Sequence, residues 1–180
     1  MDNITEWASK KLSQNVLLLD TETTGLHRAE IVDIAIIDVS GRPLINTLIK
    51  PKKPIPQAVS RIHGITDEMV ECAPTFPEVY ESIRQAIEGQ HVLIYNESFD
   101  RKILDYNCEL HGLSKLEYQS ECLMIAYAAY VGEWSDYWQN YRWQPLPAGN
   151  HRALGDCQAA LKVLRKMGLP LKEAQKEYQL

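Results

Sequence analysis

The alternation of hydrophobic and polar residues predicts three strands near the start of the chain. The apolar run at residues 15–20 indicates a fully buried strand, and a short helix over residues 4–12 precedes it. β-Branched and alternating positions at residues 30–39 and 43–50 predict a hairpin that turns at residues 40–42. After the short helix, the chain is therefore expected to form three strands, the last two of them as a hairpin.

After the hairpin, helical and strand patterns alternate. Strands followed by alternating helices and strands are typical of an α/β protein, with a mixed β-sheet flanked by α-helices. We expect one domain over residues 1–180, with a core at about 15–167. The remaining elements are helices at 56–62, 67–71, 76–88, 97–110, 122–131, 134–142, 152–167 and 171–178, and strands at 91–95 and 118–121.

Composition narrows the class of protein. Of the 180 residues, 45% are hydrophobic and 24% are charged, which is ordinary for a globular protein. No apolar run approaches the ~18 residues of a membrane span, and the start of the chain lacks the order of a secretion signal. Four cysteines without a C-x-x-C pair predict a reduced, intracellular (cytoplasmic) setting. A net charge of −5 disfavours binding of nucleic acid by bulk electrostatics, but not an enzyme that meets phosphates through metal ions.

Two carboxylates stand where the buried strand at 15–20 is expected to break into a turn. They are Asp20 and Glu22 of the sequence Asp-Thr-Glu-Thr-Thr-Gly. Residues two positions apart on a strand project to the same face. Such carboxylates repel each other unless they are protonated or share a cation. A divalent ion is therefore expected at this point.

Further candidate residues follow in two later segments. Asp100 falls in the first turn of the helix after the strand at 91–95, beyond the carboxyl end of that strand, where open α/β sheets place their sites. His151 and Asp156 lie at the start of the helix at 152–167. Each segment alone has a simpler explanation. An acid in a first turn favourably meets the helix dipole, and a His–Asp pair at this spacing is usually an exposed helix start.

The three segments together resemble the DnaQ-like exonucleases of the DEDDh type, which have a ribonuclease H-like fold. The matching order is Asp-x-Glu, then Asn-x-x-Phe-Asp, then His-x4-Asp. The resemblance runs from Val16 to Met167, and it includes residues 30–36 as a second strand and the His-Gly-Ile-Thr sequence at 63–66. Asp33 stands where the family often has glutamate, and Tyr95 where histidine is frequent.

This resemblance implies a 3′→5′ exonuclease that hydrolyses phosphodiester bonds and releases nucleoside 5′-monophosphates. Two divalent ions, Mg²⁺ or Mn²⁺, would be held by Asp20, Glu22 and Asp156 directly and by Asp100 partly through water. His151 is then the candidate general base. The expected partner is nucleic acid with a free 3′ end, with single-stranded DNA favoured. RNA trimming by the same site, and a catalytically silent nucleic-acid-binding scaffold, are the alternatives.

Residues that flank the acids are candidates for binding the substrate. Gly25 permits close approach of the backbone to a nucleotide, and Leu26 is placed to pack on a base. His63 either contacts the terminal nucleotide or stabilises its own turn. The full set of substrate-binding candidates is Thr23, Gly25, Leu26, His63, Asn96 and Phe99.

Aromatic residues are concentrated at residues 134–143. Trp134, Tyr137, Trp138 and Tyr141 follow the i, i+3, i+4, i+7 spacing of one helical face. Packing of this face into the core is the leading interpretation. Stacking on bases and contact with a second copy or another partner are the alternatives.

Overall fold

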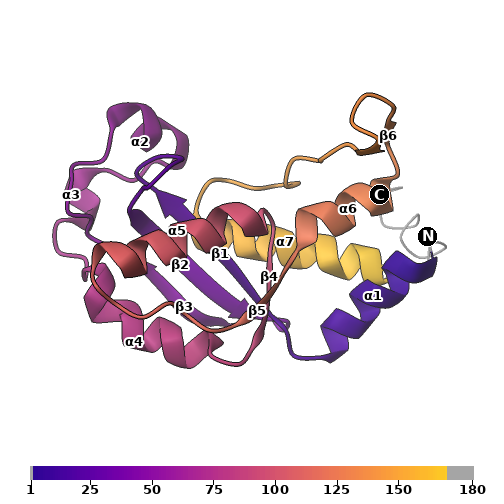
Figure 1. Cartoon of the computed structure of the whole chain (residues 1–180), viewed down its shortest axis with the longest axis horizontal. Coiled ribbons are helices and arrows are strands. Elements are labelled where there is room, and N and C mark those ends of the chain that lie inside the picture. Colours follow the sequence, from indigo (N-terminus) through magenta and orange to yellow (C-terminus); the bar gives the residue numbers. More distant parts are fainter. Residues whose placement is uncertain (1, 170–180) are drawn as a thin grey trace.

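A mixed sheet is the centre of the fold. In the computed structural model, which describes residues 2–169, the strand order is β3-β2-β1-β4-β5. β1 pairs antiparallel with β2 and parallel with β4, so the sheet changes direction at β1 (Figure 1). The hairpin predicted at residues 40–42 is confirmed, with Gly41 at a positive φ of 94°. The strands are β1 (Leu17–Thr23), β2 (Ile31–Asp38), β3 (Pro43–Leu48), β4 (His91–Ile94) and β5 (Gln119–Cys122).

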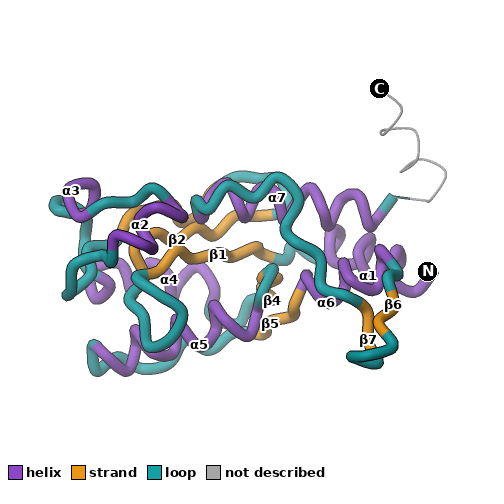
Figure 2. Tube along the Cα trace, turned by 90° about the horizontal axis from the view of Figure 1, so that it is seen from above, coloured by secondary structure: helices purple, strands orange, loops and turns teal. Residues whose placement is uncertain are grey.

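Helices cover both faces of the sheet (Figure 2). α1, α6 and α7 pack on one face, and α4 and α5 pack on the other. Every helix predicted within the described residues is present except the one at 134–142, and the predicted helix at 171–178 lies outside the described residues. The helices are α1 (Asp2–Ser13), α2 (Gln57–His63), α3 (Asp67–Val70), α4 (Phe76–Ile87), α5 (Glu97–Leu110), α6 (Leu123–Val131) and α7 (Ala153–Gly168).

The alternation of side chains along β1 assigns its residues to the two faces. Leu18 packs in the core beneath α7, whereas Leu17 and Leu19 pack in the core beneath α4 and α5. Because successive strand residues point to opposite faces, Asp20 and Glu22 continue the face of Leu18. The two acids therefore lie on the α7 side of the sheet.

The first strand differs from its predicted bounds. The prediction ended it at residue 20, but β1 continues to Thr23 and pairs with β2 along its whole length. Asp20 and Glu22 are thus strand residues rather than turn residues. Backbone pairing with β2 extends the strand through a polar sequence that the hydrophobic pattern alone does not mark.

The predicted helix at 134–142 is wrong. The segment forms a short hairpin of β6 (Trp134–Ser135) and β7 (Asn140–Tyr141) after Gly132 ends α6 in a left-handed conformation. Aromatic side chains suit strands as well as helices, and Trp134 meets Tyr141 edge-to-face across the hairpin. The expected packing into the core is also wrong, because Trp134, Tyr137, Trp138, Tyr141 and Trp143 are 38% to 83% exposed.

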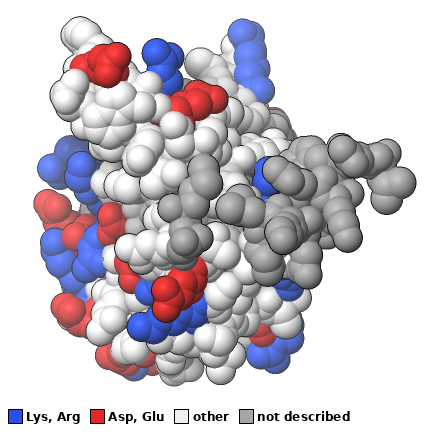
Figure 3. Space-filling view, turned by 90° about the vertical axis from the view of Figure 1, so that its right-hand side faces the viewer, with Lys and Arg blue, Asp and Glu red and all other residues white. Residues whose placement is uncertain are grey.

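The surface carries charges of both signs. On the side that bears α1 and β6, Figure 3 shows Lys and Arg interspersed with Asp and Glu. Among the described residues, no helix combines the length and the apolar character needed to cross a bilayer.

Candidate active site

The acid cluster has its centre near the carboxyl end of β1. Asp20 is surrounded by other acids, and its pKa is raised well above its ordinary value, first by burial and then by the charges of Asp100, Asp156 and Glu22. The pKa of Glu22 rises to about 8, again mainly through burial and then through the charge of Asp156. Like charges at close range favour the protonated forms. The strand therefore presents two carboxyls that are unfavourable as free anions.

Asp100 reaches the cluster from the first turn of α5. Thr21 lies between the two acids of β1 and points to the opposite face, toward α5. Its backbone N–H and its hydroxyl both donate to Oδ1 of Asp100, at 3.1 and 2.7 Å. Burial raises the pKa of Asp100 to about 7, although these hydrogen bonds from Thr21 act in the opposite direction. Thr21 thus anchors Asp100 next to β1, close enough for its charge to raise the pKa of Asp20.

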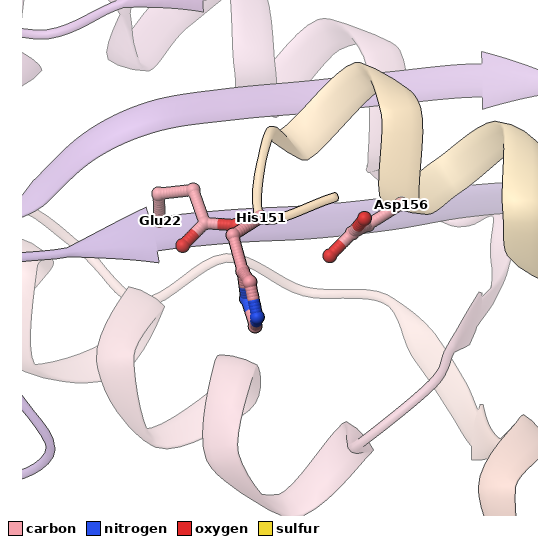
Figure 4. Close-up of side chains that lie close together, drawn as sticks. All are labelled: Glu22, His151 and Asp156. Atoms are coloured by element: carbon pink, nitrogen blue, oxygen red, sulfur yellow. The ribbon is translucent and has the colours of Figure 1, made fainter. Parts of the chain in front are cut away.

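His151 and Asp156 complete the cluster from the start of α7. Ligand atoms of Glu22, His151 and Asp156 all lie within 4.8 Å of one another. Figure 4 shows the three side chains together, with Glu22 on β1 and the other two on α7 and the segment that enters it. Asp156 is on the buried face of α7, and its Oδ1 accepts a hydrogen bond of 2.7 Å from the backbone N–H of Asn150. His151 is exposed.

This donor set fits a divalent cation. Four carboxylates meet at one edge of the sheet, and three of them have raised pKa values because burial and mutual repulsion disfavour their charges. Oxygen-rich sites of this kind are typical for Mg²⁺ or Mn²⁺, whereas Zn²⁺ favours nitrogen and sulfur. A bound cation would offset the repulsion. The acids Asp20, Glu22, Asp100 and Asp156 that the sequence singles out are therefore brought together.

One acid of this region was not predicted as a site residue. Asp33 lies directly opposite Glu22 in the β1–β2 register, and its charge contributes to the raised pKa values of Asp20 and Glu22. It is buried and accepts a 2.9 Å hydrogen bond from Nε of Arg152. The sequence did carry a signal for it, since Asp33 is an acid inside an otherwise apolar strand.

Two of the predicted substrate residues line a cavity. Leu26 and Phe99 border a volume of about 460 Å³ between the loop after β1 and α5. Leu26 is exposed, and Phe99 directly precedes Asp100 in the chain. The cavity thus lies beside the first turn of α5, the turn that also carries Asp100. Its lining also includes His27, Arg28, Ser98, Lys102, Ile103, Asp105, Tyr106, Glu109 and Lys115.

The other substrate candidates lie outside the lining of that cavity. The Thr23 hydroxyl donates to the carbonyl of Gly25 at 2.6 Å and so fixes the turn after β1. Asn96 is exposed at the N-terminus of α5, but its side chain makes no capping hydrogen bond. Contacts of these three residues with a nucleotide stay predictions.

His63 is 4% exposed and ends α2. Its Nδ1 accepts a hydrogen bond from the backbone N–H of Ile65 at 3.0 Å, which confirms the role in stabilising its own turn. Nε2 then carries the proton, and within residues 2–169 it has no hydrogen-bond partner. Burial lowers the pKa of His63, and the backbone of Thr23 partly offsets this shift. The Nε2–H of His63 is thus buried and faces the backbone of Thr23 without forming a full hydrogen bond to it.

The mixed sheet and the acid cluster at its edge define a ribonuclease H-like nuclease. The sequence matches the model of the RNase_T exonuclease family over residues 17–164. Because this match covers most of the chain, the protein belongs to this exonuclease family. It is 37% identical over 179 residues to an uncharacterized exonuclease, CP81, of Escherichia phage 186, covering 89% of this chain and 92% of that protein.

Other relatives confirm the resemblance to DnaQ-like exonucleases. The epsilon subunit of DNA polymerase III from Pasteurella multocida is 35% identical over 101 residues, which span 50% of this chain and 40% of that subunit. Exonuclease X in complex with 5′-overhanging duplex DNA superimposes with a TM-score of 0.58 and 28% identity, covering 89% of this chain and 98% of that one. Escherichia coli exonuclease I with a dA16 oligonucleotide shares the fold, with a TM-score of 0.68 at 17% identity and coverage of 92% and 43%.

Proposed function

We propose that this exonuclease removes nucleotides one at a time from the 3′ end of single-stranded or frayed nucleic acid, with DNA as the favoured substrate, and releases nucleoside 5′-monophosphates. The observation that carries the proposal is the 4.8 Å cluster of Glu22, His151 and Asp156. There, the carboxylates of Glu22 and Asp156 can bind a cation, and the imidazole of His151 can take a proton from water. Phosphodiester hydrolysis needs both.

The residues that would hold two divalent ions, Mg²⁺ or Mn²⁺, are Asp20, Glu22, Asp100 and Asp156. When bound, such ions neutralise charge on the phosphate and make water a stronger nucleophile at neutral pH. Asp20 would be the central ligand, because its carboxyl lies close enough to the other three acids for each of their charges to raise its pKa. The hydrogen bonds from Thr21 fix Oδ1 of Asp100 and so orient that carboxyl before any ion binds.

His151 acts as the general base. Its ring lies within reach of the Glu22 and Asp156 carboxylates but is exposed, so that both water and substrate can approach it. An imidazole titrates near neutral pH and can accept the proton of the attacking water on a ring nitrogen. The neighbouring carboxylates stabilise the imidazolium that results.

The cavity beside the first turn of α5 would receive the terminal base. Leu26 and Phe99 offer apolar surface at its border, and the turn fixed by Thr23 and Gly25 shapes the approach to the scissile phosphate. His63, whose Nε2–H is buried beside the backbone of Thr23, would contact the terminal nucleotide only after a local shift of this turn. We place Asn96, at the exposed start of α5, on the same route.

The substrates of similar proteins support DNA, with RNA as the alternative. Exonuclease X was solved with duplex DNA that has a 5′ overhang. The nuclease domain of 3′hExo, which is 15% identical and shares the fold, was solved with rAMP. A homodimer, or a partner contact through the exposed aromatic segment 134–143, has no support in these relatives and stays a prediction.

End-labelled oligonucleotides test the proposal. With Mg²⁺ or Mn²⁺, a 5′-labelled strand should shorten in single-nucleotide steps, a 3′-labelled strand should release labelled mononucleotide at once, and EDTA should stop both. Asp156→Asn should abolish hydrolysis, whereas Asp136→Asn, the same change in the exposed hairpin, should not. Internal cuts, or retention of the strand without cleavage, would contradict the proposal. Matched DNA and RNA strands decide the preference, since the 2′-hydroxyl is what the pocket must accept or refuse.

A further inference from the structure

His151 lies between two residues that are each tied to an aspartate. On one side, the backbone N–H of Asn150 donates to Asp156 Oδ1 at 2.7 Å. On the other side, Nε of Arg152 donates to Asp33 Oδ2 at 2.9 Å. His151 itself has a φ of 56°, a left-handed conformation that is uncommon for a residue other than glycine. The surrounding contacts must therefore hold the backbone in place.

Asp33 is the more deeply buried partner of the Arg152 pair. Its side chain is 3% exposed, whereas that of Arg152 is 44% exposed. The backbone N–H of Ala153, the first residue of α7, also approaches the same Oδ2 of Asp33, at 3.4 Å. Two donors from the start of α7 thus converge on one carboxylate oxygen of the sheet.

The position of Asp33 places its contact with Arg152 next to the active site. Asp33 is opposite Glu22 in the register of β1 and β2, and directly paired strand residues share a face. The pair with Arg152 therefore connects the strand beside Glu22 to the residue that follows His151. An acid placed so close to Glu22 would otherwise add uncompensated charge, and the guanidinium of Arg152 supplies the opposite charge.

We propose that the Asp33–Arg152 ion pair positions His151, holding its left-handed backbone so that the ring stays beside Glu22 and Asp156. Asp33 is a positioning residue and not a further cation ligand, because the donors of Arg152 and Ala153 occupy its Oδ2. This inference rests on the proposed role of His151 as the general base, but the placement of the ring can be measured without turnover.

The first test observes the ring of His151 directly. In proton–nitrogen correlation spectra of the metal-free protein, Arg152→Ala should shift or broaden the imidazole signals of His151. Those of His27, a histidine with no part in this contact, should stay unchanged. The matched control is Arg165→Ala on the same helix, because Arg165 donates a hydrogen bond of 2.8 Å to the carbonyl of Val39 in the turn after β2 and so also holds α7 against the strands. Unchanged His151 signals in Arg152→Ala would overturn the inference, whether or not the protein is an active nuclease.

The second test uses kinetics. Arg152→Ala should lower kcat at least tenfold with KM changed less than about twofold, since misplacing a catalytic group by about 1 Å can cost on the order of a hundredfold. In a His151→Ala background, the same change should have less than about a twofold further effect, because residues that act through one another are not additive.

The outcomes separate the alternatives. Additive losses from Arg152→Ala and His151→Ala, or a raised KM with an unchanged kcat, would show that Arg152 acts on its own or on the substrate, and would overturn the inference. Loss of activity in Arg165→Ala equal to that in Arg152→Ala would do the same, since it would reflect a loosened helix. A wild-type protein that releases no nucleotide refutes the proposed function instead.

Discussion

The raised pKa of Asp100 predicts that the stability of the metal-free protein depends on pH. Burial raises its pKa from the ordinary value of 3.8 to about 7, so the folded protein keeps this proton at pH values where the unfolded chain has lost it. A group whose pKa is raised on folding stabilises the fold at low pH, and that stability is lost as pH rises through the folded-state pKa. Without a metal ion, the protein should therefore become less stable between weakly acidic and weakly basic pH.

The size of the effect follows from the shift. One pKa unit corresponds to about 1.4 kcal/mol, so the free energy of unfolding should fall by about 2–3 kcal/mol between about pH 5 and about pH 8 on account of Asp100 alone. Asp20 and Glu22 act in the same direction because their pKa values are also raised. Glu22 contributes less than its shift suggests, since it is partly exposed and solvent screens its charge.

Urea unfolding at the two pH values, with EDTA present, measures this loss. Asp100→Asn keeps an acceptor oxygen for Thr21 but removes the titrating group, and should reduce the pH-dependent loss by about 2–3 kcal/mol. The matched control is Asp105→Asn. Asp105 lies on α5, as Asp100 does, and forms an ion pair with Lys115, which follows the helix. Added Mn²⁺ should restore stability at the higher pH. Equal pH dependence in wild type and Asp100→Asn would refute the reasoning.

Three further substitutions test individual contacts. Thr21→Val removes the 2.7 Å hydroxyl bond to Asp100 and should lower the turnover rate about tenfold at saturating substrate. Gly155→Ala would place a methyl group 2.2 Å from Oδ1 of the exposed Asn150 side chain, which must rotate away; thermal unfolding should show a loss of about 1 kcal/mol. Tyr95→Phe removes a hydroxyl that lies near two carbonyl oxygens of the segment leading to His151, and should cost about 1 kcal/mol in the same assay. Wild-type behaviour would contradict each assignment.

Much of the fold could be predicted from the pattern of the sequence. The apolar runs and turn residues located β1 to β5 and the helices α1 to α7, because each buries one face or one stripe. The hairpin at β6 and β7 could not be predicted in this way, since its aromatic spacing also fits a helix. The aromatic side chains of this hairpin are exposed, so the rule that apolar periodicity marks a buried face did not apply.

The acids of the site could be predicted because their spacing and order form a recognisable motif. Their convergence follows from the alternation of β1 and from the buried face of α7. The contact of Asp33 with Arg152 could not be predicted, because it joins two positions far apart in the sequence and neither residue is one of the five motif positions that carry the chemistry. Such ties depend on how α7 packs on the sheet, which the sequence pattern does not specify.

A crystal grown with Mn²⁺ tests most directly whether these acids form one cation site. Anomalous scattering should show manganese among the carboxylates of Asp20, Glu22, Asp100 and Asp156, with His151 at its edge. The same experiment on Asp20→Asn should show that signal weakened or lost. Manganese bound only elsewhere on the protein, with this cluster empty at saturating Mn²⁺, would contradict the account.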